Sequence, residues 1–125
     1  MKLHSGIITD KLIESKEFYT QILDFEIKFE SDWFILLNVK ERPEYELALM
    51  LPEQAQTRKD YFQKKYSSGI WLLLEVEDIQ EYFTKLKNKK VKIDLELTTE
   101  EWGDTHFTVL DPNGIGIDIL QERKQ

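Results

Sequence analysis

The sequence predicts one α+β domain made of two similar halves. Two amphipathic helical segments each stand between one short strand segment and a run of three more. The halves also echo each other, since Phe-Tyr-Thr at 18–20 corresponds to Tyr-Phe-Thr at 82–84, and Ile22 to Leu86. Strands and helices in separate runs of this kind indicate a mostly antiparallel or mixed sheet. Two half-sheets, each with one helix outside, can curl together around a shared groove.

The first half, about 1–52, begins with a strand at 3–9 and a helix at 13–23. The helix shows apolar residues at helical spacing, namely Phe18, Tyr19, Ile22 and Leu23. Strands are expected at 25–30, 33–39 and 44–51. A linker of about 54–67 is predicted to contain a short helix near 57–66.

The second half, about 68–122, repeats this order. After a strand at 69–76, Asp78 is a good N-cap and Glu81 completes a capping box. The helix stripe has i, i+3, i+4, i+7 spacing and consists of Ile79, Tyr82, Phe83 and Leu86. Strands should follow at 91–97, 105–110 and 115–121.

Composition excludes several classes of function. The chain has 125 residues, 41% of them hydrophobic, and no cysteine, so thiolate metal sites and cysteine nucleophiles are impossible. A net charge of −7 argues against nucleic acid as a ligand, because phosphate contacts need basic surfaces. No apolar segment approaches the length of a signal core or a membrane span, so we expect a cytoplasmic protein without a membrane partner.

Several motifs, in their order along the chain, resemble those of the vicinal-oxygen-chelate superfamily. This superfamily contains glyoxalase I, bleomycin-resistance proteins, fosfomycin-resistance enzymes and extradiol dioxygenases. The motifs are Ser-Lys-Glu-Phe-Tyr-Thr-Gln-Ile-Leu-Asp-Phe at 15–25, Val-Glu-Asp-Ile at 76–79, Trp-Gly at 102–103 and Asp-Pro-Asn-Gly at 111–114. The resemblance implies two βαβββ modules forming a curled mixed sheet around a groove, and a homodimer. Asp24 and Lys90 stand where the family has glycine, at helix ends that take the left-handed conformation.

The resemblance also implies four stations for metal ligands, one on each of four strands. The first station is filled by His4, eleven residues before Ser15, and the last falls on Asp118. Asp118 lies in a strand in which Ile115, Ile117 and Ile119 alternate with it, so it should face away from the core.

The other two ligand positions do not carry a residue that binds metals in the family. The third falls on Trp71, and indole cannot ligate a metal ion; the second falls near Ala48 or Met50, with Glu46 one step away on the same face. Two protein ligands seldom hold a catalytic ion, so we expect no metal cofactor, although a divalent metal is possible.

If a metal does bind, the candidate ligands are His4 and Asp118 with Glu46 or His106. His106 alternates with residues that face the core and should therefore share a face with Asp118. The plainer alternatives are that His4 is a surface residue and Asp118 a solvated one.

We interpret the groove as a pocket for a small organic ligand, planar or cationic. The candidate ligand-binding residues are Trp71, Met50, His106, Asp118 and Trp102. The first hypothesis is therefore a small-molecule-binding protein with an incomplete metal site. The alternative is a metal-dependent lyase, isomerase or dioxygenase, and a third is a partner-binding module; the residues do not decide whether the protein is an enzyme.

Overall fold

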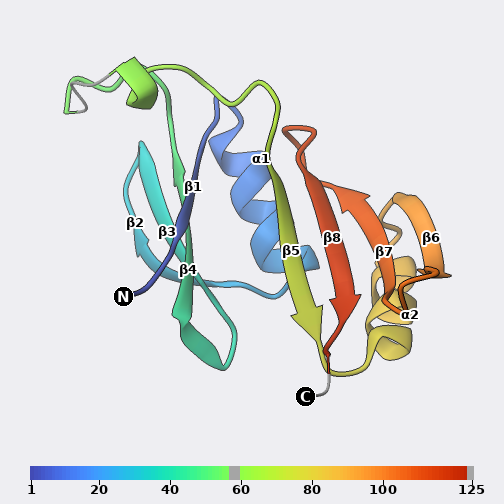
Figure 1. Cartoon of the computed structure of the whole chain (residues 1–125). Helices are drawn as coiled ribbons and strands as arrows, with labels where there is room; N and C mark the ends of the chain where they lie inside the picture. Colours follow the sequence, from blue (N-terminus) through green and yellow to red (C-terminus); the bar gives the residue numbers. More distant parts are fainter. Residues whose placement is uncertain (57–59, 124–125) are drawn as a thin grey trace. The chain divides into compact units, whose positions relative to one another are not determined.

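The computed structural model describes residues 1–56 and 60–123, and it divides into two compact units, Met1–Ser67 and Ser68–Gln125 (Figure 1). Each unit contains a four-stranded mixed sheet and an α-helix. The predicted α+β class and the repeated βαβββ order are therefore confirmed.

Unit 1 follows the predicted order of elements. It contains β1 (Ser5–Ile8), α1 (Leu12–Glu17), the π-helical turn η1 (Phe18–Ile22), β2 (Glu26–Glu30), β3 (Phe34–Val39) and β4 (Arg42–Met50). The strand order is β1-β4-β3-β2, in which β1 is parallel to β4 and the other neighbours are antiparallel.

Unit 2 has the same topology. It contains β5 (Trp71–Val76), α2 (Ile79–Asn88), β6 (Ile93–Thr99), β7 (Thr105–Leu110) and β8 (Gly116–Gln121). The order β5-β8-β7-β6 again places one parallel pair, β5 with β8, beside two antiparallel pairs.

Each sheet buries the face that its helix covers. The fully buried hydrophobic side chains of unit 1 are Tyr19, Ile35, Leu37 and Leu49, and those of unit 2 are Leu86, Phe107, Val109, Ile115, Ile117 and Ile119. In unit 2 the rings of Phe83 and Phe107 pack edge to face at 4.9 Å. Because side chains alternate along a strand, the opposite face of each sheet is left for polar and exposed residues.

The helix ends agree with the sequence analysis. The backbone N–H of Glu81 donates to Oδ1 of Asp78 at 3.1 Å, as the predicted N-cap requires. Asp24 and Lys90 have φ angles of 60° and 61°, so both take the left-handed conformation in which glycine is cheapest.

Two elements differ from the expectation. The first helix passes into η1, where the N–H of Leu23 donates to the carbonyl of Phe18, one residue beyond α-helical spacing. The predicted linker helix is present, among the described residues, only as the 3-10 turn η2 (Asp60–Phe62); residues 57–59 lie outside them. Tyr61 and Phe62 are exposed, so this segment has no core against which a longer helix would pack.

Candidate functional site

One face of the unit 2 sheet collects most of the candidate ligand-binding residues. In the strand register, Trp71 lies beside Gly116, Leu73 beside Asp118, and Asp118 beside Thr108 of β7. His106 lies two positions from Thr108 on the same strand, so it shares their side of the sheet. We call this the ligand face and define it by Trp71, Leu73, His106, Gly116 and Asp118.

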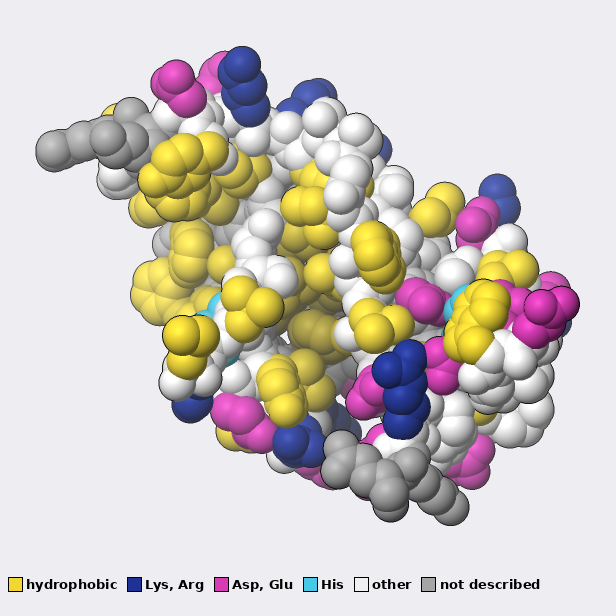
Figure 2. Space-filling model, in the orientation of Figure 1, with side chains coloured by type: hydrophobic (Ala, Val, Ile, Leu, Met, Phe, Trp, Pro, Cys, Tyr) yellow, Lys and Arg dark blue, Asp and Glu magenta, His cyan; other side chains and the backbone are white. Residues whose placement is uncertain are grey.

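The ligand face exposes apolar surface at Trp71. The indole is 67% exposed and Leu73 beside it is 51% exposed, although both lie in the middle of the chain on a regular strand. Gly116 contributes no side chain, and a Cβ at that position would lie 3.8 Å from the Cβ of Trp71. The indole therefore stands beside a bare stretch of backbone that a flat ring can approach. Figure 2 shows hydrophobic side chains over β5 and β8 with acidic ones and a histidine nearby.

His106 is held between two carboxylates at the edge of this face. Its Nδ1 lies 2.6 Å from Oδ1 of Asp118, and its Nε2 lies 3.0 Å from Oε2 of Glu100. Hydrogen bonding to Asp118, and then to Glu100, raises the pKa of His106 even though burial acts against the charged form. A protonated imidazole leaves the cluster with one net negative charge.

A hairpin turn fixes Glu100 in place. The backbone N–H of Glu100 donates to the carbonyl of Asp104 at 2.8 Å across the turn between β6 and β7. The side chain of Asp104 accepts hydrogen bonds from Arg123 and from Nε1 of Trp102. Arg123 holds the pKa of Asp104 below its ordinary value. The turn therefore presents Trp102, 72% exposed, while it supports Glu100 against His106.

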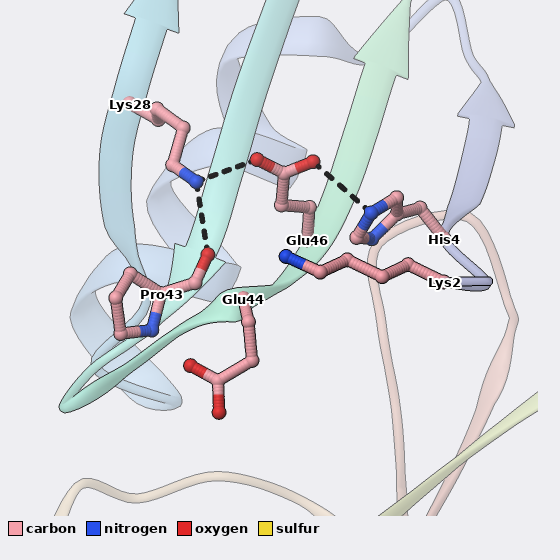
Figure 3. Close-up of a pocket in the computed structure, with 6 residues that line it drawn as sticks. All are labelled: Lys2, His4, Lys28, Pro43, Glu44 and Glu46. Carbon is pink, nitrogen blue, oxygen red and sulfur yellow. Dashed lines mark hydrogen bonds and ion pairs between the residues drawn. The ribbon is translucent and has the colours of Figure 1, made fainter.

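A second histidine–carboxylate pair lies in unit 1. Nε2 of His4 is 3.5 Å from Oε1 of Glu46, and Nζ of Lys28 is 2.5 Å from Oε2 of the same carboxylate (Figure 3). The hydrogen bond from Lys28 lowers the pKa of Glu46. Glu46 is therefore a carboxylate with both oxygens already engaged.

The structure thus distributes the predicted site residues over both units. Unit 2 brings Trp71, His106 and Asp118 to one face and places Trp102 on the adjoining turn. Unit 1 brings His4 and Glu46 together, whereas Met50 is buried at the other end of β4, opposite Phe34.

Sequence reasoning missed two of the residues that shape these clusters. Glu100 has a detectable signal, because it carries a carboxylate and lies six residues before His106, in the loop between the strands predicted at 91–97 and 105–110. Lys28 has none, because it lies at an irregularity of β2 that no sequence pattern marks.

The donor sets do not by themselves form a metal centre. Within residues 1–56 and 60–123, no group of three or more histidine, aspartate or glutamate side chains is arranged to hold a metal ion. Both nitrogens of His106 face carboxylates on opposite sides of the ring, so a metal there would have to displace one of them. The cluster around His106 therefore does not fit a resident metal as it stands, and His4 with Glu46 supplies only two ligands.

The sequence profile of the Glyoxalase/Bleomycin resistance protein/Dioxygenase superfamily matches residues 3–119. The chain belongs to this superfamily. The resemblance read from the motifs is thereby confirmed.

Several solved structures share the fold. Lactoylglutathione lyase from Agrobacterium tumefaciens aligns with a TM-score of 0.75 at 12% identity, covering 95% of this chain and 92% of that one. A member of the superfamily from Sphaerobacter thermophilus aligns with a TM-score of 0.73 at 22% identity, covering 98% of both chains. TnmS3, an antibiotic binding protein from Streptomyces sp. CB03234, aligns with a TM-score of 0.72 at 18% identity, covering 98% and 95%.

No protein of curated function matches the sequence. Among the helices of the described residues, none combines the length and the apolar character needed to cross a membrane.

Proposed function

We propose that the protein is a cytoplasmic small-molecule-binding protein whose ligand is a planar organic molecule bearing positive charge. The observation that supports this most is the exposed indole of Trp71 on a regular strand, beside the bare backbone of Gly116. A flat ring stacked on Trp71 would cover apolar surface that is otherwise left in water.

The charge of the ligand follows from the neighbours of Trp71. Asp118 accepts from His106 through Oδ1, and among the described residues its second oxygen has no hydrogen-bond partner. Glu75 is exposed on the same side of β5 as Trp71, because the two residues are four apart on a strand. A cation over the indole gains roughly 0.5–2 kcal/mol, and the carboxylates add to that attraction.

Membership of the superfamily supports this proposal, because its members include bleomycin resistance proteins and TnmS3 is an antibiotic binding protein. By the same resemblance we propose a homodimer. Size-exclusion chromatography with light scattering tests the dimer, and a single species with the mass of one 15.0 kDa chain would contradict it.

The test compares two planar dyes of opposite charge. Proflavine, a cationic tricyclic ring, should bind and quench tryptophan fluorescence, whereas anthraquinone-2-sulfonate, an anionic tricyclic ring, should bind much more weakly. Trp71→Ala should weaken proflavine binding by roughly tenfold, the loss of one stacked aromatic contact. Asp118→Asn should weaken proflavine binding. It should also reduce the ratio of the affinity for proflavine to the affinity for anthraquinone-2-sulfonate.

Tyr61→Ala is the matched control, because Tyr61 is also a largely exposed aromatic residue but lies in unit 1 on η2. Its proflavine affinity should equal that of the wild type. Trp102→Ala measures whether the turn adds a second contact. Unchanged proflavine affinity in Trp71→Ala would overturn the proposal.

The second candidate is a metal-dependent lyase, isomerase or dioxygenase. The adjacency of His4 and Glu46 in unit 1 favours it, because two of the predicted ligands lie within reach of each other. Metal analysis of purified protein decides between the candidates: stoichiometric divalent metal that is lost in His4→Ala would support the enzyme and exclude the metal-free binder.

A further inference from the structure

Unit 1 contains a pocket of about 320 Å³ beside the His4–Glu46 pair. Its lining residues are Lys2, His4, Lys28, Pro43, Glu44 and Glu46 (Figure 3). None of them belongs to the ligand face of unit 2. We call it the lysine pocket.

Two irregularities of the sheet build this pocket. In β2, Ile27 pairs with Leu37 and Phe29 pairs with Leu36, so Lys28 is an extra residue that opposes no partner. In β4, the register jumps from Glu46 to Arg42, which leaves Pro43 outside the ladder. Bulges redirect side chains and occur often beside functional sites. Here they bring the ammonium of Lys28 to the carbonyl of Pro43, at 2.9 Å, and to Glu46.

The lysine pocket has more donors than acceptors. Both oxygens of Glu46 are engaged, one by Lys28 and one by His4. The carboxylate of Glu44 is bound to Arg42 and points away from the other side chains in Figure 3. Lys28 uses two of its three N–H groups, on Glu46 and Pro43.

Lys2 supplies the decisive donor. Lys2 lines the pocket, and in the described part of the chain its ammonium makes no hydrogen bond or ion pair, although its charge helps to lower the pKa of Glu44 and of Glu46. The two lysines of the lining equal Glu44 and Glu46 in charge, but both carboxylates are already engaged, while Lys2 and Lys28 keep N–H groups that can still donate. What the pocket lacks is therefore an acceptor from outside for these N–H groups.

We propose that the lysine pocket binds a small oxyanion, a carboxylate or a phosphate, through the ammonium groups of Lys2 and Lys28. An oxyanion offers several acceptor oxygens, which match the spare N–H groups of two point-like cations. The imidazole of His4 lines the same pocket and adds a polar contact. The lysine pocket shares no residue with the ligand face, whereas His4 and Glu46 are also the candidate ligands of the metal-dependent enzyme considered second above.

The experiment titrates the intact protein with sodium phosphate and, separately, with sodium acetate, at constant ionic strength set by sodium chloride. Amide chemical shifts of residues 2, 4, 28 and 46 are followed by NMR. Saturable shifts with either anion support the proposal, and the tighter of the two identifies the class of oxyanion. Shifts no larger than those caused by chloride alone would overturn it.

Three variants sharpen the result. Lys2→Gln should weaken anion binding by roughly tenfold, since one charge-assisted contact is lost. Lys40→Gln, an exposed lysine on the turn between β3 and β4, should leave it unchanged. Glu46→Gln should strengthen anion binding severalfold, because it removes a negative charge and releases Lys28. Lys2→Gln without effect, or Glu46→Gln weakening the binding, would refute the assignment.

Discussion

The imidazole of His106 and the carboxylate of Asp118 meet across two neighbouring strands, with Nδ1 and Oδ1 only 2.6 Å apart. In the register His106 lies opposite Leu120 and Asp118 lies opposite Thr108, so the two are diagonal neighbours on one face. Their separation is that of a charge-assisted hydrogen bond. The pair therefore ties β7 to β8 at the edge of the ligand face.

The stability that His106 contributes should depend on pH. Its pKa is raised in the folded protein by Asp118 and then by Glu100, so its contribution is fully present below about pH 6.5, the unfolded value. The contribution is lost as the pH rises through the raised pKa. We expect His106→Gln to cost about 1–2 kcal/mol at pH 5.5 and clearly less at pH 9. Urea unfolding followed by tryptophan fluorescence measures both.

The comparison with the wild type at each pH removes the effect of other titrating groups, including Asp104, whose charge also reaches His106. A cost that is equal at the two pH values, or larger at pH 9, would show that His106 is not held as an imidazolium.

The two carboxylates should not contribute equally to the pKa of His106. Asp118 is the larger cause of the raised pKa and makes the shorter hydrogen bond, at 2.6 Å against 3.0 Å for Glu100. Asp118→Asn should therefore lower the pKa of His106 more than Glu100→Gln does. NMR titration of the imidazole C–H signals measures both shifts, and the reverse order would contradict the geometry.

Replacing Lys90 by glycine should stabilise the protein. Lys90 has a φ of 61°, a conformation that costs a non-glycine residue about 1 kcal/mol. The greater chain entropy of glycine in the unfolded state offsets part of this gain, so we expect about 0.5 kcal/mol. Lys89→Gly is the control, because Lys89 has a φ of −80° and glycine there should destabilise. Thermal unfolding of both variants measures the two effects. A Tm that falls in Lys90→Gly would contradict the prediction.

The fold was predictable because its signals are local. The capping box at Asp78, the apolar stripes of the helices and the alternation of Ile115, Ile117 and Ile119 each specify an element from neighbouring residues. The face shared by His106 and Asp118 followed from alternation on two strands predicted to pair. The elements of the fold and this shared face can be predicted because side chains recur with the fixed periods of the helix and the strand.

The features that the sequence does not predict depend on inserted residues or on contacts between residues that are far apart in the sequence. The π-helical turn at Phe18–Ile22 and the bulge at Lys28 each insert one residue, and no propensity marks the insertion. The sequence predicts a short helix near 57–66 in the linker, whereas a helix is stable only where it has an apolar face to bury. Which side chain engages Glu46 is decided by the bulge, so the lysine pocket could not be read from the sequence.

Adding a methyl group at Gly116 should separate ligand binding from folding. A Cβ there would make an ordinary contact, 3.8 Å from the Cβ of Trp71, and alanine removes chain entropy from the unfolded state. We therefore expect Gly116→Ala to leave the free energy of unfolding unchanged or to raise it by up to about 1 kcal/mol. The methyl group would nevertheless stand where a flat ring must approach the backbone beside Trp71, so proflavine affinity should fall severalfold. Fluorescence titration and urea unfolding on the same samples give both quantities. A stable Gly116→Ala protein that binds proflavine as tightly as the wild type would show that the ring does not lie over Gly116.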